Sequence, residues 1–382
     1  MQIVTVVPSI VPSAAPQDHL ADWTEPGASR IAPAVVVIPC YRVGHRVLDV
    51  IAGVGDVVDR IYVVDDACPE RTGDLVAREC RDPRVRVVRH GRNQGVGGAT
   101  ITGIRAALAD DSDVIVKLDG DGQMDPAMLP VLIALVRSGQ ADYAKGNRFF
   151  DPDAVAAMPP VRLVGNAGLS FLTKISTGYW KSFDPTNGYF AIHGDVARLL
   201  PLDRIARRYF FESDLLFRLS TFRAKVVDVP MPAVYGDETS GLAPARMVIP
   251  FALGHLRNFC KRIAYNYFLR DFSLASVQLL AGLTLLLFGS AFGLAHWGAS
   301  PTVASSGTVM LAGVTVILGV QFLLAFLAHD IQSAPEAALH PRLTAWSSSL
   351  RSRPRSPPEE PTCAPNRTSR STTDASPTPT TR

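Results

Sequence analysis

The chain has 382 residues, of which 47% are hydrophobic and 19% are charged, and its formal net charge is +3. This length allows one large catalytic domain with appendages, and so small a net charge gives no reason to expect a nucleic-acid partner. The five cysteines include no C-x-x-C pair, which argues against a disulfide framework or a zinc site and fits a reducing compartment.

The first segment, residues 1–32, is rich in Pro, Ala and Ser, and we predict a disordered leader there. No basic residues precede its apolar positions and prolines interrupt it early, so the pattern does not match a signal peptide.

A catalytic domain is expected over residues 33–245, because short apolar runs alternate there with helical stretches such as Val47–Val58 and Gly97–Ala109. Four of these runs have the composition of buried strands: Ala34–Pro39, Arg60–Asp66, Val85–His90 and Asp113–Asp121. The alternation predicts an α/β fold with a mainly parallel central sheet and right-handed crossovers. Ligands of such sheets bind at the carboxyl ends of the strands, so the polar residues that follow each strand are the first functional candidates.

Residues 246–272 carry Arg257, Lys261, Arg262 and Arg270 among aromatic side chains. Basic and aromatic residues beside an apolar span are typical of a juxtamembrane helix that lies at the surface of an anionic membrane. We therefore expect an interfacial helix here, with membrane lipid as a partner.

Two long apolar runs follow within residues 273–329, at Leu274–Ala295 and Val309–Ala328, and neither contains Lys, Arg, Asp or Glu. Each is long enough to cross a membrane, and the link His296–Thr302 would make them a helical hairpin. The alternative is a pair of buried core helices. The positive-inside rule places the catalytic domain in the cytoplasm, attached to a multi-pass segment of the cytoplasmic membrane. Residues 330–382, rich in Ser, Thr, Pro and Arg, are predicted to be a disordered cytoplasmic tail.

The segment Lys117–Pro126, KLDGDGQMDP, carries the strongest chemical signal. Asp119 and Asp121 follow a buried strand two residues apart, and alternate residues of an extended chain point the same way, so both can meet one divalent cation such as Mg²⁺ or Mn²⁺. Gln123 adds a neutral oxygen at the next alternate position. The intervening glycines let a diphosphate approach the backbone. The alternative is an acidic turn at the surface.

Two further motifs suggest nucleotide binding. Asp65 and Asp66 end the second strand, where a carboxylate can accept hydrogen bonds from a base or a ribose. Gly95, Gly97 and Gly98 open a helix whose first turn could hold a phosphate. Close packing of that helix against the sheet explains the same glycines equally well.

The segment Phe210–Leu219 has two interpretations. Glu212 and Asp214 near the start of an apolar helix could supply a general base. Asp214 could equally cap a core helix and interact with its N-terminal dipole.

The motifs IPCY, VVDDACPERT, NQGVGGA and DGDGQ, in this order and spacing, resemble the family-2 glycosyltransferases of the GT-A fold. Among these, the chain is most similar to the polyprenyl-phosphate hexose transferases, the group that includes dolichyl-phosphate mannose synthase and its bacterial relatives. The resemblance covers about residues 34–242, and the paired apolar runs extend it.

The resemblance implies a role for several residues. Pro39 and Tyr41 would line the nucleotide pocket, and Asp66, with Asp65, would recognise the nucleoside. Asp119, Asp121 and Gln123 would hold the metal, and Arg148 would lie near the phosphates. The segment Asp184–Ile192 would shape the sugar and acceptor site. The segment Tyr235–Leu242 would close over the donor and the acceptor phosphate, although it lacks the usual arginine and lysine, so a phosphate role for Thr239 or Ser240 stays open.

We therefore expect inverting transfer of a hexose from a UDP- or GDP-linked sugar to a polyprenyl phosphate at the cytoplasmic membrane face. The alternative within enzymes is transfer to a hydroxyl of a lipid-linked glycan or polysaccharide, with Asp214 as the base. A membrane-tethered scaffold without activity is a third hypothesis, and the intact D-x-D-x-Q pattern argues against it. A homo-oligomer is compatible with each of these.

Overall fold

The computed structural model describes residues 33–150, 152–156, 158, 160–232, 244–296 and 304–351. The predicted leader 1–32, the segment Tyr235–Leu242 with Thr239 and Ser240, most of the predicted link His296–Thr302, and the tail beyond residue 351 lie outside these residues.

A seven-stranded mixed sheet forms the centre of the domain, in the order β3-β2-β1-β4-β6-β5-β7. The strands are β1 (Ala34–Cys40), β2 (Arg60–Asp65), β3 (Val85–Arg89), β4 (Val114–Lys117), β5 (Tyr143–Asn147), β6 (Phe190–His193) and β7 (Val226–Pro230). Neighbouring strands are parallel except at β6, which runs antiparallel to both β4 and β5. The predicted α/β fold with a mainly parallel sheet is confirmed.

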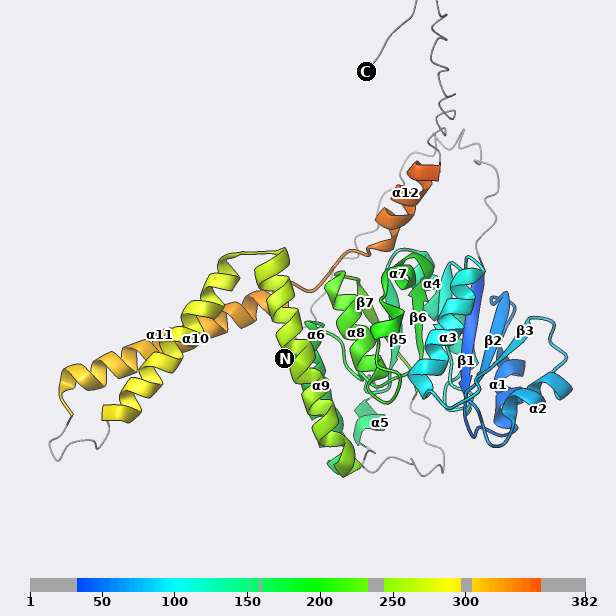
Figure 1. Cartoon of the computed structure of the whole chain (residues 1–382), viewed down its shortest axis with the longest axis horizontal. Helices are drawn as coiled ribbons and strands as arrows, with labels where there is room; N and C mark the ends of the chain where they lie inside the picture. The colour runs from blue at the N-terminus through cyan, green and yellow to red at the C-terminus, as the bar shows by residue number, and fades with distance from the viewer. Residues whose placement is uncertain are drawn as a thin grey trace, which may run out of the picture.

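Helices cover both faces of this sheet, giving three layers (Figure 1). They are α1 (Arg46–Gly53), α2 (Thr72–Glu79), α3 (Val96–Ala109), α4 (Leu129–Arg137), α5 (Pro152–Ala156), α6 (Pro160–Thr177), α7 (Gly194–Leu199) and α8 (Phe211–Thr221). Side chains alternate along β1: Val36 and Ile38 pack in one core with α1 and α4, while Val35 and Val37 pack in a second core with α3 and α8. A strand buried on both faces needs the continuous apolar run that the sequence shows.

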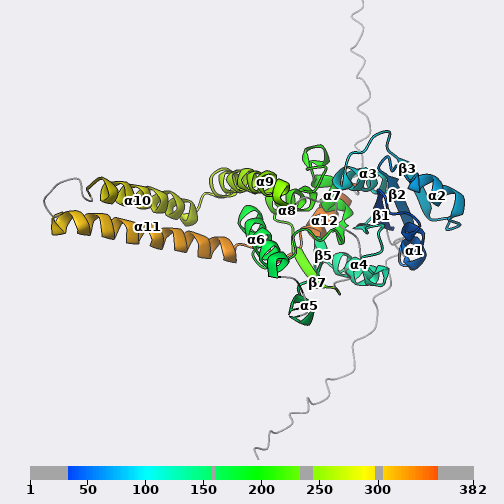
Figure 2. The same ribbon diagram turned by 90° about the horizontal axis from the view of Figure 1, so that it is seen from below.

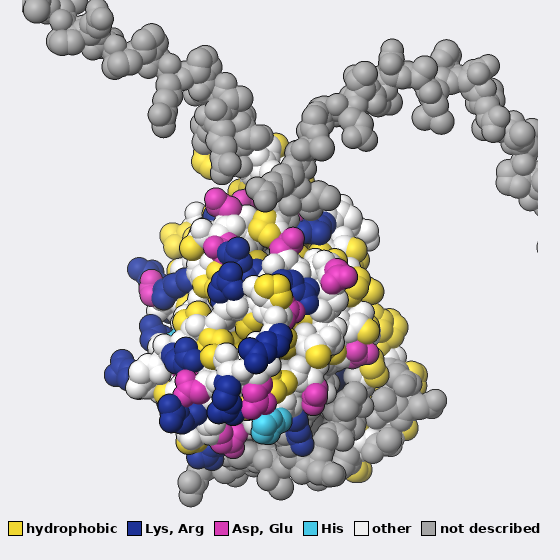
Figure 3. Space-filling view, turned by 90° about the vertical axis from the view of Figure 1, so that its right-hand side faces the viewer, with side chains coloured by type: hydrophobic (Ala, Val, Ile, Leu, Met, Phe, Trp, Pro, Cys, Tyr) yellow, Lys and Arg dark blue, Asp and Glu magenta, His cyan; other side chains and the backbone are white. Residues whose placement is uncertain are grey.

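The strand β3 differs from its prediction. It forms where expected but lies at the edge of the sheet and is only partly buried, with Arg86 and Arg89 exposed. Arginines on an edge strand oppose pairing with another chain. Figure 3 faces this side of the molecule, where basic and acidic side chains are interspersed. Two of the ion pairs here join Arg84 to Asp82 and Arg89 to Asp74.

The chain then leaves the sheet domain. Its elements are α9 (Pro244–Ala264), the π-helical segment η3 (Tyr265–Arg270), α10 (Leu274–His296) and α11 (Ser306–Gln332). Helix α9 packs beside α6, and α10 packs against α11 in a hairpin that projects from the domain (Figures 1 and 2). Both hairpin helices are long and apolar enough to cross a membrane, and only 11% of the most apolar window of each is buried. Such exposure excludes the alternative of buried core helices.

The helix α9 has an exposed apolar side with Ile249, Leu253 and Leu256, and Arg257 and Lys261 are exposed beyond it. An interfacial position of this helix stays a prediction. Arg262 differs from the prediction that it faces lipid. It is 3% exposed, and its Nη1 lies 2.6 Å from Oδ1 of Asp330 near the end of α11.

The prediction that the chain is disordered from residue 330 is wrong for residues 330–351. Helix α11 continues to Gln332, and a further helix, α12 (His340–Arg351), packs beside α7 (Figure 1). The backbone amides of Leu339 and His340 donate to Asp142 just before β5, and His340 Nδ1 lies 2.8 Å from Oδ1 of that carboxylate. The imidazole of His340 also stacks on His193. Composition averaged over the tail could not reveal this contact, because its partner lies 198 residues earlier.

Candidate active site

A cavity of about 420 Å³ opens at the carboxyl ends of β1, β2 and β4, where ligands of parallel sheets bind. It brings together several residues that the sequence predicted for the site: Pro39, Tyr41, Asp66, Asp119 and Asp121. Asn93, the start of α3, Arg208 and Tyr209 complete much of its wall. A cavity of this size is within the usual range for a small-molecule site.

The acidic turn after β4 carries the chemistry of this cavity. Asp119 Oδ1 lies 2.8 Å from Nζ of the buried Lys117, and that nitrogen lies 3.6 Å from Oε1 of Glu212 on α8. Burial by itself would lower the pKa of Lys117, but the two carboxylates outweigh it and hold this pKa above its ordinary value. Burial raises the pKa of Glu212. The lysine therefore stays charged, and its ion pair holds the side chain of Asp119 in place.

Two close approaches hold this turn in place. A Cβ at Gly120 would lie 3.2 Å from Ile38 Cγ2 and 3.3 Å from Cys40 Sγ, so the turn packs tightly on β1. A Cβ at Gly188 would collide with Lys117 Nζ. The TNGYF segment can thus cover the lysine only because residue 188 has no side chain.

The arrangement fits a divalent cation. Asp119 and Asp121 line the same cavity, and carboxylate oxygens are the ligands that Mg²⁺ and Mn²⁺ prefer. Gln123 is not among the lining residues, and its backbone amide donates to Asp121 Oδ1 at 3.0 Å. Within the described ranges, no group of three or more His, Cys, Asp or Glu side chains forms a closed site. Further ligands would have to come from a bound diphosphate and water.

The two aspartates after β2 have separate positions. Asp65 accepts hydrogen bonds from the amides of Cys68 (2.7 Å) and Gly73 (2.6 Å), so it holds the turn into α2 and does not line the cavity. Asp66 does line the cavity. It accepts from the amides of Gln94 (2.8 Å) and Gly95 (2.7 Å), which fixes the loop before α3.

The glycines that open α3 serve close packing. A Cβ at Gly97 would lie 2.7 Å from the carbonyl oxygen of Ala206 and 2.7 Å from Phe211 Cδ2, and Gly97 does not line the cavity. For Gly97 this matches the packing interpretation, whereas Gly95 lines the cavity and its contact with a ligand stays a prediction. Gly95, with φ of +86°, lies against Arg207 and Arg208 in the same way.

This packing explains a part of the site that sequence reasoning missed. The chain before α8 is drawn against the start of α3, and Arg208 and Tyr209 thereby enter the cavity wall. The glycines were the only available signal, because nothing in the local pattern of residues 206–210 indicates a binding role.

Arg148 is engaged away from the cavity. Its Nε and Nη2 donate to the two oxygens of Asp184, each at 2.8 Å. Burial would raise the pKa of Asp184, but Arg148 outweighs it and holds this pKa below its ordinary value. The pair fixes the start of the segment Asp184–Ile192. Contact between Arg148 and a phosphate stays a prediction.

Of the two interpretations of Asp214, its surroundings fit the core helix and not the general base. Asp214 is fully buried and does not line the cavity. Its Oδ1 accepts from Asn258 Nδ2 on α9 and its Oδ2 from the amide of Ala206, both at 3.0 Å. A carboxylate with both oxygens engaged in the core ties elements together and has no access to a substrate. Asp214 joins α8 to α9 and to the segment that carries Arg208.

Comparison with known proteins adds independent findings. A model of glycosyl transferase family 2 matches residues 35–199. The undecaprenyl-phosphate mannosyltransferase of Micrococcus luteus is 33% identical over 52% of this chain and 83% of its own length. A UDP-N-acetylglucosamine–dolichyl-phosphate N-acetylglucosaminyltransferase of Methanococcus voltae is 28% identical over 53% of this chain and 86% of its own. Among solved structures, glucosyl-3-phosphoglycerate synthase of Mycobacterium tuberculosis aligns with a TM-score of 0.45 and 18% identity over 60% of this chain and 80% of that one.

The mainly parallel sheet, with a cavity at its strand ends and an acidic D-x-D turn in that cavity, defines a glycosyltransferase domain of the GT-A type. The chain belongs to glycosyl transferase family 2.

Proposed function

We propose that this protein transfers a hexose from a UDP- or GDP-linked sugar to a polyprenyl phosphate at the cytoplasmic face of a membrane. The observation that carries the proposal is the cavity that holds Asp119 and Asp121 beside Pro39, Tyr41 and Asp66. The names of the relatives from Micrococcus luteus and Methanococcus voltae, both of which act on polyprenyl phosphates, support the acceptor.

The donor would lie along the cavity. Pro39, Tyr41 and Asp66 would bind the nucleoside, and Asp119 and Asp121 would hold Mg²⁺ or Mn²⁺ next to the diphosphate. When bound, such a cation neutralises negative charge on a departing diphosphate. Arg208 lines the same cavity and would add a guanidinium contact to the diphosphate.

In the reaction, a phosphate oxygen of the acceptor attacks the anomeric carbon of the donor sugar. The new carbon–oxygen bond forms as the bond to the nucleoside diphosphate breaks, with inversion at that carbon. A phosphate acceptor is already ionised at neutral pH, so no base has to remove a proton. The burial of Asp214 favours this acceptor over a sugar hydroxyl, which would need a base.

The membrane placement follows from α9 and the hairpin. The exposed Ile249, Leu253 and Leu256 would lie in the membrane surface, with Arg257 and Lys261 near anionic headgroups. The hairpin of α10 and α11 would cross the membrane twice, and the basic side would face the cytoplasm.

A transfer assay tests this function. Membranes that contain the protein are incubated with a panel of radiolabelled UDP- and GDP-sugars, and the product is extracted with organic solvent and treated with mild acid. One donor should give a lipid-soluble, acid-labile product, and membranes with the Asp119→Asn variant should give none. Label that appears only in acid-stable glycan would contradict the polyprenyl-phosphate acceptor.

A further inference from the structure

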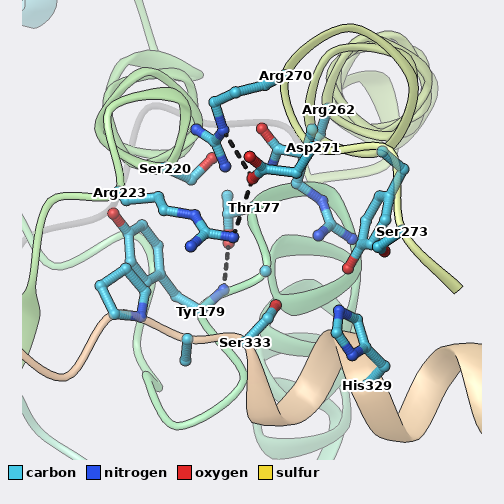
Figure 4. Close-up of a pocket in the computed structure, with 15 residues that line it drawn as sticks. Thr177, Tyr179, Ser220, Arg223, Arg262, Arg270, Asp271, Ser273, His329 and Ser333 are labelled. Carbon is cyan, nitrogen blue, oxygen red and sulfur yellow. Dashed lines mark hydrogen bonds and ion pairs between the residues drawn. The ribbon is translucent and has the colours of Figure 1, made fainter. Parts of the chain in front are cut away.

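A second cavity, of about 260 Å³, lies at the base of the hairpin (Figure 4). The ends of α6 and α8 form one side of it, and η3, the start of α10 and the end of α11 form the other. If the hairpin spans a membrane, this cavity lies at the level of the lipid headgroups, because α10 starts and α11 ends beside it.

The charged side chains of this cavity are mainly basic: Arg223, Arg262 and Arg270, with one carboxylate, Asp271. Arg262 is already paired with Asp330. Arg223 Nη2 and Arg270 Nε lie 3.2 Å and 3.1 Å from the same Oδ2 of Asp271, as Figure 4 shows. Two guanidinium groups thus share one carboxylate, and one positive charge remains for an anion.

Two buried polar atoms beside this cavity have no hydrogen-bond partner within the described part of the chain. Among the described residues, Arg262 Nε and Asn266 Oδ1 are buried side-chain atoms with no hydrogen-bond partner. Both residues line the cavity, and Arg262 is 3% exposed. Buried donors and acceptors in native proteins are almost always satisfied, so these atoms call for water or a bound polar group.

An apolar groove continues from the polar cavity. Ser273 and His329 line both spaces. The second one, of about 400 Å³, lies at the start of α10 and the end of α11 and is lined further by Leu274, Ala275, Gln278, Ala325, Ala328 and Gln332. A polar cavity that passes into an apolar groove on a membrane-crossing hairpin suits a ligand with an anionic head and a hydrocarbon chain.

The cavity is separate from the donor site. Helix α8 starts at Phe211, which packs on Gly97 beside the donor cavity, and ends at Thr221, whose carbonyl oxygen accepts from Arg270. Its 11 residues span roughly 16 Å at about 1.5 Å per residue. A polyprenyl phosphate held here would keep its phosphate too far from Asp119 to react.

We propose that this cavity binds the phosphate of an anionic membrane phospholipid, with Arg223 and Arg270 on the phosphate and an acyl chain in the groove beside Ala328. The arginines would exchange part of their contact with Asp271 for the lipid phosphate, as charge-assisted bonds to phosphate allow. The proposal depends on the hairpin crossing a membrane and not on the transfer reaction.

Binding to the full-length protein in neutral detergent tests the proposal. Thermal unfolding is measured against short-chain phosphatidylglycerol, short-chain phosphatidylcholine and glycerol 3-phosphate, because a ligand that binds the folded state raises the Tm. Phosphatidylglycerol should raise the Tm saturably at concentrations where the other two do not. Equal effects of the two lipids, or equally tight binding of glycerol 3-phosphate, would overturn the lipid site.

Matched variants locate the binding. The double variant Arg223→Gln/Arg270→Gln should weaken phosphatidylglycerol binding by about 10-fold or more, since it removes both charge-assisted contacts to the phosphate. The control Arg78→Gln/Arg81→Gln removes the same charge from exposed positions at the end of α2 and should leave binding unchanged. A similar loss in both would indicate general electrostatic attraction and refute the site.

Two single variants keep the proposal testable if the double variant fails to fold. Asp271→Asn removes the competing carboxylate, so phosphatidylglycerol should bind several-fold more tightly. Ala328→Trp fills the groove from an exposed position and should weaken binding of the lipid. Unchanged or weaker binding with Asp271→Asn, or unchanged binding with Ala328→Trp, would contradict the proposed contacts.

Discussion

The two edges of the sheet use charged residues differently. At the carboxyl end of β4, Asp119 and Asp121 face a cavity. Asp66, after β2, lines the same cavity, but its oxygens also hold the amides of Gln94 and Gly95. At the opposite edge, before the amino end of β5, Asp142 meets His340 in the segment that follows the hairpin. The buried pair of Arg262 and Asp330 joins α9 to α11 near that same edge.

The carboxylates at the two edges therefore have different roles: those at one edge would bind a cation, and those at the other hold two segments of the chain together. A carboxylate that is to hold a cation has to keep oxygens accessible, whereas a carboxylate that holds two segments together has its oxygens occupied. Asp214 belongs to the second kind although it lies near the site in the sequence. The partners of a carboxylate are therefore a better guide to its role than its distance along the chain from a motif.

The largest effect, a loss of activity, is expected from changes to the two aspartates of the D-x-D turn in the cavity. Asp119→Asn or Asp121→Asn should lower kcat/KM by about 10³-fold, because metal-assisted charge stabilisation is worth several kcal/mol. Transfer is measured with a fixed donor and saturating Mn²⁺. Asp125→Asn, in the same motif but exposed and outside the cavity, is the control and should stay near wild type. Near-normal turnover of both variants, with or without chelator, would show the metal assignment to be wrong.

Breaking the buried pair of Arg262 and Asp330, which joins α9 to α11, should destabilise the protein without changing the rate of transfer from the donor. Arg262→Met leaves a buried carboxylate without its main partner and should lower the free energy of unfolding by about 3 kcal/mol. Arg262→Met/Asp330→Leu should recover part of this loss. Arg257→Met, exposed on the same helix, should change stability by about 0.5 kcal/mol or less. Denaturant unfolding in detergent measures all three, and equal stability of Arg262→Met and Arg257→Met would refute the role of the pair.

Truncation after Phe272 tests whether the two edges are independent. The residues that line the donor cavity all precede the hairpin, so nucleotide binding should persist. The truncated domain should unfold several degrees lower, because Asp330 and α12 are lost. Arg262→Met in the truncated domain should restore part of the Tm. Loss of nucleotide binding on truncation would show that the edges are coupled.

The smallest effect is a loss of stability at low pH where Asp142 holds the segment that contains His340. Burial would raise the pKa of Asp142, but His340 and the amides of Leu339, His340 and Lys225 outweigh it and lower this pKa below its ordinary 3.8. The stability from these contacts is therefore present above that value and lost as the pH falls below it. The protection of α12 amides against hydrogen exchange, relative to the intrinsic exchange rate at each pH, should fall below about pH 4 earlier than that of α3. Simultaneous loss of protection in both helices would contradict local release of α12.

Local patterns allowed much of the site to be predicted. The strands β1, β2 and β4 were recognisable because each is a continuous apolar run, and the D-x-D turn follows one of them directly. Arg208 was not recognisable, since it reaches the cavity only when its segment folds against Gly95.

The sequence could not decide the role of Asp214 or reveal helix α12, and the two failures have a common cause. An aspartate in the first turn of a helix has the same sequence pattern whether it is a base or, like Asp214, a buried anchor for Asn258. The docking of α12 likewise depends on a pairing across 198 residues, which composition does not encode.

The way in which the sheet domain is attached to the hairpin affects how it encounters a lipid substrate. The chain leaves the sheet domain through α9 and returns through the contact of His340 with Asp142, so the domain is fixed to the hairpin at two points. A domain on one flexible tether would tumble above the bilayer and present its cavity in every direction. Two attachments leave little rotation, so a lipid that diffuses in the plane meets the cavity in nearly one orientation. The rotational freedom of the domain is then already restricted before the lipid binds, so less of it has to be lost on binding.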